Sequence, residues 1–226
     1  MEKLFEENKL SPSKIQLEQF ERYYELLIYY NDKFNITAIT EKEEVYKKHF
    51  IDSILGSEKL CGKTLLDVGS GGGFPALPLK IVNPNIELTM LEATGKKCEF
   101  LREVAKELNL DNVSVINGRA EDYAKNINFR QQFDTVTARA VARLNVLCEY
   151  CMPFVKVGGK FLSYKGDGAD EIKQAHNSIN ILGGKITEIY EYDFYDAKRT
   201  LISIEKVKDT NIKYPRANGV IRKRPL

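Results

Sequence analysis

The sequence predicts an α/β protein with a seven-stranded sheet, whose last strand runs antiparallel to the others, and a small helical N-terminal extension. Three observations lead to this prediction. From residue 63 onward, short apolar runs typical of strands alternate with helical segments. The first of these runs passes into a glycine-rich turn, as a strand does before a helix. The last two runs are separated by only a few residues, which favours a hairpin.

The first 60 residues have a helical pattern. Large apolar side chains recur at helical spacing from Ile15 to Tyr30, after a Ser-Pro-Ser segment whose serines can cap the helix. Residues 42–57 predict one or two further helices, and residues 36–40 a loop. The expected division of the chain is a helical extension at 1–60, a main domain at 61–210 and a basic C-terminal tail at 211–226.

Strands and helices alternate along the main domain. Such alternation implies a parallel sheet with right-handed crossovers. The segment 195–198 is too short for a crossover, so the final strand should be antiparallel. The expected strands are 64–69, 86–92, 113–117, 133–138, 160–165, 186–193 and 199–206, and the expected helices are 75–82, 94–109, 121–126, 143–156 and 169–182.

The segment TLLDVGSGGGF, residues 64–74, is the most informative in the chain. A buried strand reaches Asp67, and the glycines that follow let a ligand lie directly on the main chain because they lack a Cβ. A dinucleotide fingerprint starting at Gly69 would need a third glycine where this chain has Phe74. An acid two residues before glycines at alternate positions resembles instead the first motif of S-adenosylmethionine-dependent methyltransferases. A tight turn without a ligand remains the alternative.

Polar groups follow the next three strands. Ligands of open α/β sheets bind beyond the carboxyl ends of the strands, where these groups should meet. Glu92 can accept both hydroxyls of a ribose, unless it is a surface acid. Ala120 and Glu121 can address an adenine edge through a main-chain N–H and a carboxylate, although an acid there also caps a helix. Arg139 can pair with the carboxylate of a cofactor or with a substrate phosphate.

The composition is that of an ordinary globular protein, with 43% hydrophobic and 29% charged residues. No apolar stretch approaches the roughly 18–20 residues of a membrane span, and the acidic N-terminus has no signal-peptide core. We therefore expect a cytoplasmic protein without a membrane partner. Cys148 and Cys151 form a single CxxC on a predicted helix, so core packing is favoured over redox or metal chemistry, and no metal is expected.

Methyltransferases that act on different acceptor atoms differ in their sequence motifs. Methyl transfer from a sulfonium is an in-line displacement in which positioning supplies most of the catalysis. The fourth strand ends in Thr137-Ala138-Arg139-Ala140 rather than in the Pro-Pro loop of adenine amino methylation, and neither cysteine of the CxxC has the setting of a C5-methylation nucleophile. Guanine N7 has a free lone pair and needs neither base nor nucleophile. It is therefore compatible with a site for which we predict no catalytic acid or base.

Nearly the whole chain, from residue 30 to the end, resembles the ribosomal RNA small-subunit methyltransferase G family, formerly called glucose-inhibited division protein B. Two departures are Tyr30, where members often carry tryptophan, and Ala76, where glycine is usual. The resemblance is carried by DVGSGGGFPALPL at 67–79, NITAI at 35–39, HFIDSI at 49–54, Arg119-Ala120-Glu121, Ala138-Arg139-Ala140, and Tyr214-Pro215-Arg216 with Gly219 and the terminal KRPL.

The resemblance implies the class I fold of S-adenosylmethionine-dependent methyltransferases. It also implies methylation of N7 of a guanine in the decoding-region loop of 16S rRNA (position 527), with S-adenosylhomocysteine as the product and with rRNA or the small ribosomal subunit as partner of a monomer. A small-molecule methyltransferase and a non-enzymatic ribosome-binding factor are the rivals. The basic tail argues against the first, and the intact set of site residues against the second.

The candidate residues fall into two groups. The net charge of +2 does not itself indicate a nucleic acid, but no acid follows Asp209, and five cations do, as in a solvated tail or a phosphate-binding arm. The cofactor-binding candidates are Asp67, Gly69, Gly71, Gly73, Phe74, Glu92, Ala120, Glu121 and Arg139. The RNA-binding candidates are Asn35, Thr37, Lys165, Arg199, Arg216, Lys223 and Arg224.

Overall fold

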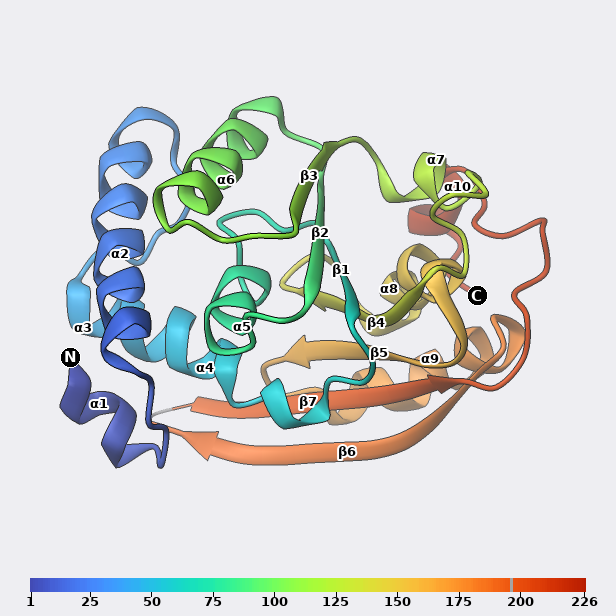
Figure 1. Cartoon of the computed structure of the whole chain (residues 1–226). Helices are drawn as coiled ribbons and strands as arrows, with labels where there is room; N and C mark the ends of the chain where they lie inside the picture. The colour runs from blue at the N-terminus through green and yellow to red at the C-terminus, as the bar shows by residue number, and fades with distance from the viewer. Residues whose placement is uncertain (196) are drawn as a thin grey trace.

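The computed structural model describes residues 1–195 and 197–226, and it consists of one seven-stranded sheet with helices on both faces (Figure 1). Asp196, in the hairpin between the last two strands, lies outside the described residues. The strands follow the order β3-β2-β1-β4-β5-β7-β6 across the sheet. Their bounds are β1 Thr64–Val68, β2 Glu87–Glu92, β3 Val113–Asn117, β4 Phe133–Arg139, β5 Val155–Lys165, β6 Gly184–Phe194 and β7 Ala197–Lys206.

The sheet is parallel from β3 to β5, and β7 pairs antiparallel with both of its neighbours. The short connection between β6 and β7 forces the chain to double back, which confirms the predicted direction of the last strand. The chain leaves β1 toward β2 on one side and reaches β4 on the other. The carboxyl ends of these strands therefore border the crevice in which open α/β sheets bind ligands.

Helices α5 (Ala76–Val82) and α6 (Gly95–Glu107) cover one face of the sheet, and α2 (Lys14–Phe34) packs on both of them (Figure 1). Ser13 caps α2 through a reciprocal pair of hydrogen bonds with Gln16, as the sequence predicts. The shorter N-terminal elements are α1 Glu2–Glu7, α3 Lys42–Val45, a π-helical turn Tyr46–Ile51, α4 Asp52–Ile54 and a 3₁₀ turn Ser57–Lys59.

The N-terminal extension shares its core with the main domain. Phe20 and Tyr23 of α2 pack on Phe50, and Tyr23 also contacts Phe100 of α6. These four side chains are fully buried, in the same cluster as Leu65 of β1 and Leu88 and Met90 of β2. Burial of so many rings makes the extension a structural part of this face rather than an appended module.

The other face carries α7 (Ala120–Tyr123), α8 (Leu144–Cys151), α9 (Ala169–Ile181) and α10 (Asn218–Lys223) (Figure 1). The predicted helix 143–156 is wrong beyond residue 151. A 3₁₀ turn at Met152–Phe154 follows, and β5 begins at Val155, five residues before the expected start at 160. Pro153 has no N–H with which to continue the helix.

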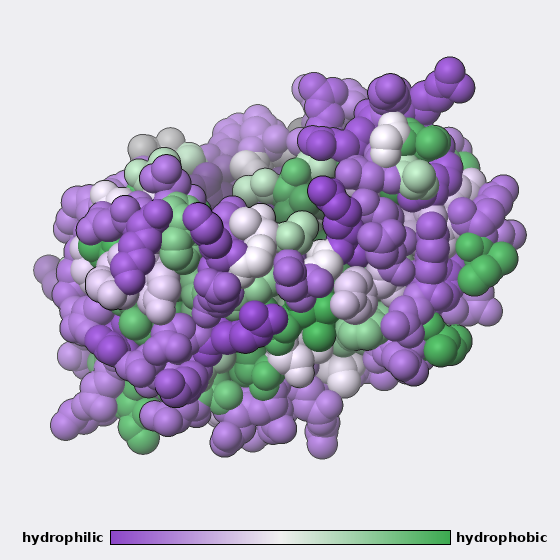
Figure 2. All heavy atoms as spheres, turned by 90° about the horizontal axis from the view of Figure 1, so that it is seen from above, coloured by the Kyte–Doolittle hydropathy of each residue, from purple (hydrophilic) through white to green (hydrophobic). Residues whose placement is uncertain are grey.

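The C-terminal segment 211–226 is not a free tail. Tyr214 and Ile221 are buried in the core beneath α8, and the Arg130 guanidinium donates hydrogen bonds of 2.7 Å and 2.8 Å to the carbonyls of Thr210 and Tyr214. Among the described residues no helix combines the length and the apolar character needed to cross a membrane, and the face shown in Figure 2 is mostly hydrophilic.

Candidate functional site

The turn after β1 has a backbone that favours glycine. Gly69, Gly71 and Gly73 have φ angles of 75°, 55° and 90°. A Cβ on Gly73 would lie 2.5 Å from the Tyr23 hydroxyl, so this glycine lets α2 approach the turn. A Cβ on Gly71 would have only the Gly69 carbonyl within 4 Å, at 3.8 Å, so the backbone there faces open space. Gly71 is the position where a ligand can lie on the main chain.

Glu92, at the end of β2, holds this turn. One carboxylate oxygen accepts a hydrogen bond of 2.9 Å from the Gly71 N–H, and the other accepts one of 2.8 Å from the Thr94 N–H. Two backbone donors fix the orientation of the carboxylate but leave part of its acceptor capacity unused. It borders the cavity beside the turn, where it can accept hydroxyl groups of a bound ligand.

Two adjacent cavities follow the carboxyl ends of β1, β2 and β4. The loop cavity, of about 480 Å³, lies beside the glycine turn, and the helix cavity, of about 240 Å³, lies between α7 and α10. Both include Gly69, Ala93 and Val141, so the two cavities are neighbours at this point. The loop cavity is also lined by Ile36, His49, Ser70, Gly71, Gly72, Phe74, Glu92, Lys97, Arg139 and Ala140, and the helix cavity by Val68, Leu91, Gly118, Arg119, Ala120, Glu121, Ala142, Tyr150, Asn218 and Arg222.

Asp67 and Gly73 differ from the other cofactor candidates because they line neither cavity, and the Asp67 side chain is buried. The Thr137 hydroxyl donates to one carboxylate oxygen at 2.7 Å, and the second oxygen has no hydrogen-bond partner among the described residues. Burial raises the pKa of Asp67 to about 7. The Ser70 hydroxyl donates to the Asp67 carbonyl at 3.1 Å, so Asp67 belongs to the support of the turn.

A stack of rings backs the loop cavity. Phe74 lies between His49 and Tyr23, with ring centroids 4.4 Å and 5.6 Å away and nearly parallel planes. The Tyr23 hydroxyl donates to the Gly72 carbonyl, which ties helix α2 to the glycine turn. The sequence did not single out His49 as a site residue, although it lies in one of the motifs of the resemblance.

His49 is held as a neutral imidazole. Its Nε2 bonds the Thr37 hydroxyl at 2.8 Å, and its Nδ1 has no partner among the described residues. Burial, and then the nearby Arg139 cation, lower the pKa of His49 to about 3. Thr37, a candidate for RNA contact, therefore reaches the loop cavity through His49, while Asn35 is exposed at the end of α2.

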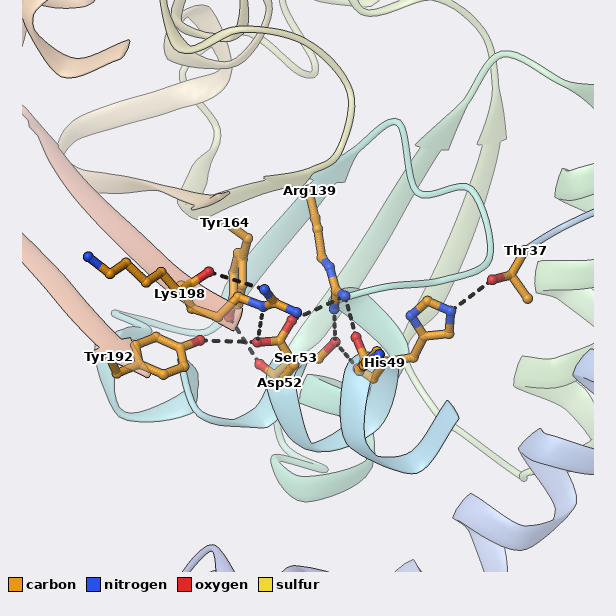
Figure 3. A network of polar contacts seen from close by, with 10 residues as sticks. Thr37, His49, Asp52, Ser53, Arg139, Tyr164, Tyr192 and Lys198 are labelled. Atoms are coloured by element: carbon orange, nitrogen blue, oxygen red, sulfur yellow. Dashed lines mark hydrogen bonds and ion pairs between the residues drawn. The ribbon is translucent and has the colours of Figure 1, made fainter. Parts of the chain in front are cut away.

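Arg139, which lines the loop cavity, meets Asp52 in a network of polar contacts (Figure 3), and Arg199 completes this charged cluster. Arg139 pairs with the Asp52 carboxylate at 3.1 Å and donates to the Ser53 hydroxyl and to the Lys48 carbonyl. Arg199 pairs with the other oxygen of Asp52, also at 3.1 Å, and the Tyr192 hydroxyl donates to that oxygen at 3.3 Å. Two guanidinium groups thus share one carboxylate that is only 4% exposed, which leaves the cluster one positive charge in excess.

We call the third cavity, of about 230 Å³, the arginine cavity. It is lined by Asp52, Arg139, Ala140, Tyr164, Lys165, Gly166, Tyr192, Arg199 and Thr200. Arg139 and Ala140 also line the loop cavity, so the two cavities share a wall. The predicted meeting of strand ends thus gathers the candidates from β2, β4, β5 and β7 along one edge of the molecule.

Three of the predicted RNA-binding cations are engaged within the chain rather than free. Arg199 is paired with Asp52, Lys165 pairs with Glu171 at 2.8 Å, and Arg216 forms a two-pronged ion pair with Glu149. Sequence reasoning missed these pairs because their acids lie on other elements. Lys223 and Arg224 are exposed at the end of α10.

Other reactive side chains lie away from these cavities. Cys148 and Cys151 are buried in α8, and burial raises the pKa of the Cys148 thiol to about 12, so that it is not a nucleophile at neutral pH. Within the described part of the chain, no group of three or more His, Cys, Asp or Glu side chains is arranged to hold a metal ion.

The chain has extensive similarity to known proteins. The family model described as rRNA small subunit methyltransferase G matches residues 16–212. Proteins named Ribosomal RNA small subunit methyltransferase G are 47% identical to the chain in Lactobacillus johnsonii, over 93% of this chain and 92% of the relative, and in Streptococcus pneumoniae, over 99% and 97%.

Solved structures of low sequence identity share the fold. Cofactor-bound Rv0187 from MTB superposes with a TM-score of 0.60 at 16% identity, over 83% of this chain and 91% of the other. A SAM-dependent methyltransferase from Aquifex aeolicus has a TM-score of 0.53 at 16% identity, over 73% and 93%. The predicted class I methyltransferase fold is thereby confirmed.

Proposed function

The chain belongs to the rRNA small subunit methyltransferase G family, and from this premise we propose that it methylates N7 of a guanine in 16S rRNA, at the decoding-region loop. It is an S-adenosylmethionine-dependent methyltransferase. When bound, this cofactor supplies a methyl group on a sulfonium, which is already a good leaving group.

The two adjacent cavities fit the two ends of the cofactor. The helix cavity, with Ala120 and Glu121, would take the adenine, and the loop cavity, beside Gly71, would take the amino acid part. Glu92 lies where the ribose would bridge them, since its carboxylate is already oriented by the turn. Gly69 and Val141 line both cavities and so mark where the two are closest in the fold.

The observation that carries the substrate class is the shared wall of the loop and arginine cavities. Arg139 lines both, so an anionic group bound in the arginine cavity would lie next to the methyl donor. The excess positive charge of the cluster formed by Arg139, Arg199 and Asp52 suits a phosphate of RNA, and guanidinium groups bind phosphate well. Lys223 and Arg224 would add exposed cations for the rest of the RNA.

The loop cavity also suits a nucleophile that needs no base. The neutral His49, with its pKa lowered to about 3, is a poor proton acceptor, and Lys97 and Arg139 are cations. Guanine N7 attacks with an in-plane lone pair and loses no proton, so positioning by the cavity walls is sufficient. A guanine turned out of its stack would have to enter here, next to the wall formed by Ile36 and His49.

Methyl transfer to isolated substrates tests the proposal. The protein is incubated with S-adenosylmethionine carrying a tritiated methyl group, together with small subunits or deproteinised 16S rRNA from cells that lack the gene. We expect label in the rRNA, and chain cleavage at a single guanine after borohydride and aniline, the reaction of N7-methylguanosine. Label that appears only in a small-molecule extract, and not in the rRNA, would support a small-molecule methyltransferase. Binding to subunits without transfer would support the non-enzymatic factor.

The setting of the reaction follows from the proposed substrate. Because ribosomal RNA and small subunits are the proposed substrates, we propose that the protein acts in the cytoplasm and as a monomer. The same assay with the two substrates in parallel distinguishes naked rRNA from the assembled subunit. The Glu92→Ala variant serves as the control that should lose transfer on both.

A further inference from the structure

The helix cavity has a wall that comes from the C-terminal segment. Asn218 and Arg222 of α10 line it, together with Ala120 and Glu121 of α7. The family match ends at residue 212, so this wall lies outside the part of the chain that the family model describes. None of the cofactor candidates from the sequence comes from this segment.

Asn218 has an unused donor at this wall. Its side-chain oxygen accepts a hydrogen bond of 2.5 Å from the hydroxyl of Tyr150, which also lines the helix cavity. With its oxygen accepting from Tyr150, the amide can donate only through its nitrogen. Within the described part of the chain the Asn218 side-chain nitrogen makes no hydrogen bond, so it remains available to a ligand in the cavity.

Arg222 differs from the other arginines near this segment. The Arg130 guanidinium donates to backbone carbonyls, and the Arg216 guanidinium donates to Glu149. Arg222 makes neither a hydrogen bond nor an ion pair within the described residues, yet it lines the cavity. A guanidinium plane at the mouth of a cavity can lie over the face of an aromatic base.

The segment is held in place independently of any ligand. Arg216 donates to the buried Glu149 through its guanidinium and its backbone N–H, and it also bonds the Arg224 carbonyl at the end of α10. Ile221 of the same helix is fully buried in the core. The donors of Asn218 and Arg222 are therefore presented on a fixed support, which lowers the entropic cost of using them.

We propose that α10 completes the binding site for the adenosine part of the cofactor, with the Asn218 amide donating to a ring nitrogen of adenine and the Arg222 guanidinium lying over the base. This inference rests on the proposed function for the identity of the ligand. Adenine offers ring-nitrogen acceptors and one amino donor. Glu121, which also lines the cavity, can accept from the amino group, so α7 and α10 supply complementary partners.

Calorimetry with S-adenosylhomocysteine tests the inference on the full-length protein. Asn218→Asp keeps the oxygen that accepts from Tyr150 but removes the amide donor, and Arg222→Gln removes the guanidinium. Lys223→Gln makes the same charge change at an exposed neighbouring position and is the matched control. We expect each of the first two variants to bind about tenfold more weakly, and the control to bind within about twofold of the parent.

A second ligand separates recognition of adenosine from a general loss of structure. Methylthioadenosine has the adenosine but not the amino acid, so the two variants should lose the same factor in affinity for it. Their melting temperatures should stay unchanged. If the parent protein binds S-adenosylhomocysteine and both variants bind it equally well, the inference is overturned. It is also overturned if Lys223→Gln loses as much affinity as Arg222→Gln. If the parent binds neither ligand, it is the proposed cofactor function that fails.

Discussion

Replacing Arg216 by alanine should destabilise the protein strongly, because Arg216 neutralises a buried acid. The carboxylate of Glu149 is 0% exposed, and its oxygens accept hydrogen bonds of 2.8 Å and 2.6 Å from the Arg216 side chain and one of 2.8 Å from the Arg216 backbone. The variant would leave this charge with the single backbone donor. Breaking a buried pair in this way costs about 3–5 kcal/mol, a large part of the ~5–15 kcal/mol that stabilise a typical domain.

Urea unfolding of four proteins measures this effect. Arg216→Ala should lose about 3–5 kcal/mol, and the double variant with Glu149→Gln should lose less than Arg216→Ala alone, because no uncompensated charge remains buried. Lys223→Ala, at an exposed position of the same segment, should stay within about 0.5 kcal/mol of the parent. A loss below about 1 kcal/mol for Arg216→Ala, with a clear fall in RNA affinity, would refute this reasoning and support the role in RNA binding predicted from the sequence.

Two further predictions concern Glu92 and Asp67, the two acids that support the glycine turn. Glu92→Ala should weaken S-adenosylmethionine binding by about 1.5–3 kcal/mol in calorimetry, and a loss below about 0.3 kcal/mol would make Glu92 merely a support of the turn. Asp67 has a folded-state pKa raised from 3.8 to about 7, so its contribution to stability is present below pH ~4 and is lost as the pH rises toward 7. Between pH 4 and pH 8 the free energy of unfolding of Asp67→Asn, measured in urea, should therefore rise by up to about 4 kcal/mol relative to that of the parent. A difference between the two proteins that does not change with pH would contradict the buried, protonated state of Asp67.

The parts of the fold that follow from local pattern were predictable from the sequence. The direction of β7 depends on the short connection before it, and the start of α2 on Ser13 and its partner Gln16. The sequence predicts the start of β5 too late, at 160, because its helical pattern continues past Pro153. In the structure this proline follows the end of α8, and β5 begins directly after the turn that contains it. Helix α10 was missed because six residues between a proline and the chain end carry almost no periodicity.

The candidate site was predictable where strand ends carry the chemistry, and less so where distant elements meet. Glu92 could be placed because the end of a strand fixes its position. The pairing of Arg139 and Arg199 with one acid could not, since Asp52 comes from the N-terminal extension and is far from both in the sequence. His49 likewise reaches the loop cavity by packing on Phe74, a contact that no spacing rule predicts.

The bond between the Tyr23 hydroxyl and the Gly72 carbonyl bears on how relatives of this protein can be recombined. A chimaera that takes its first 60 residues from one relative and the rest from another inherits this tyrosine and the glycine turn from different parents. The ring of Phe74 is wedged between Tyr23 and His49, both from the exchanged part, so a mismatch there would shift the turn itself. Such hybrids would lose cofactor affinity while every residue of the turn is intact, and screening for defects only around the glycines would overlook their cause.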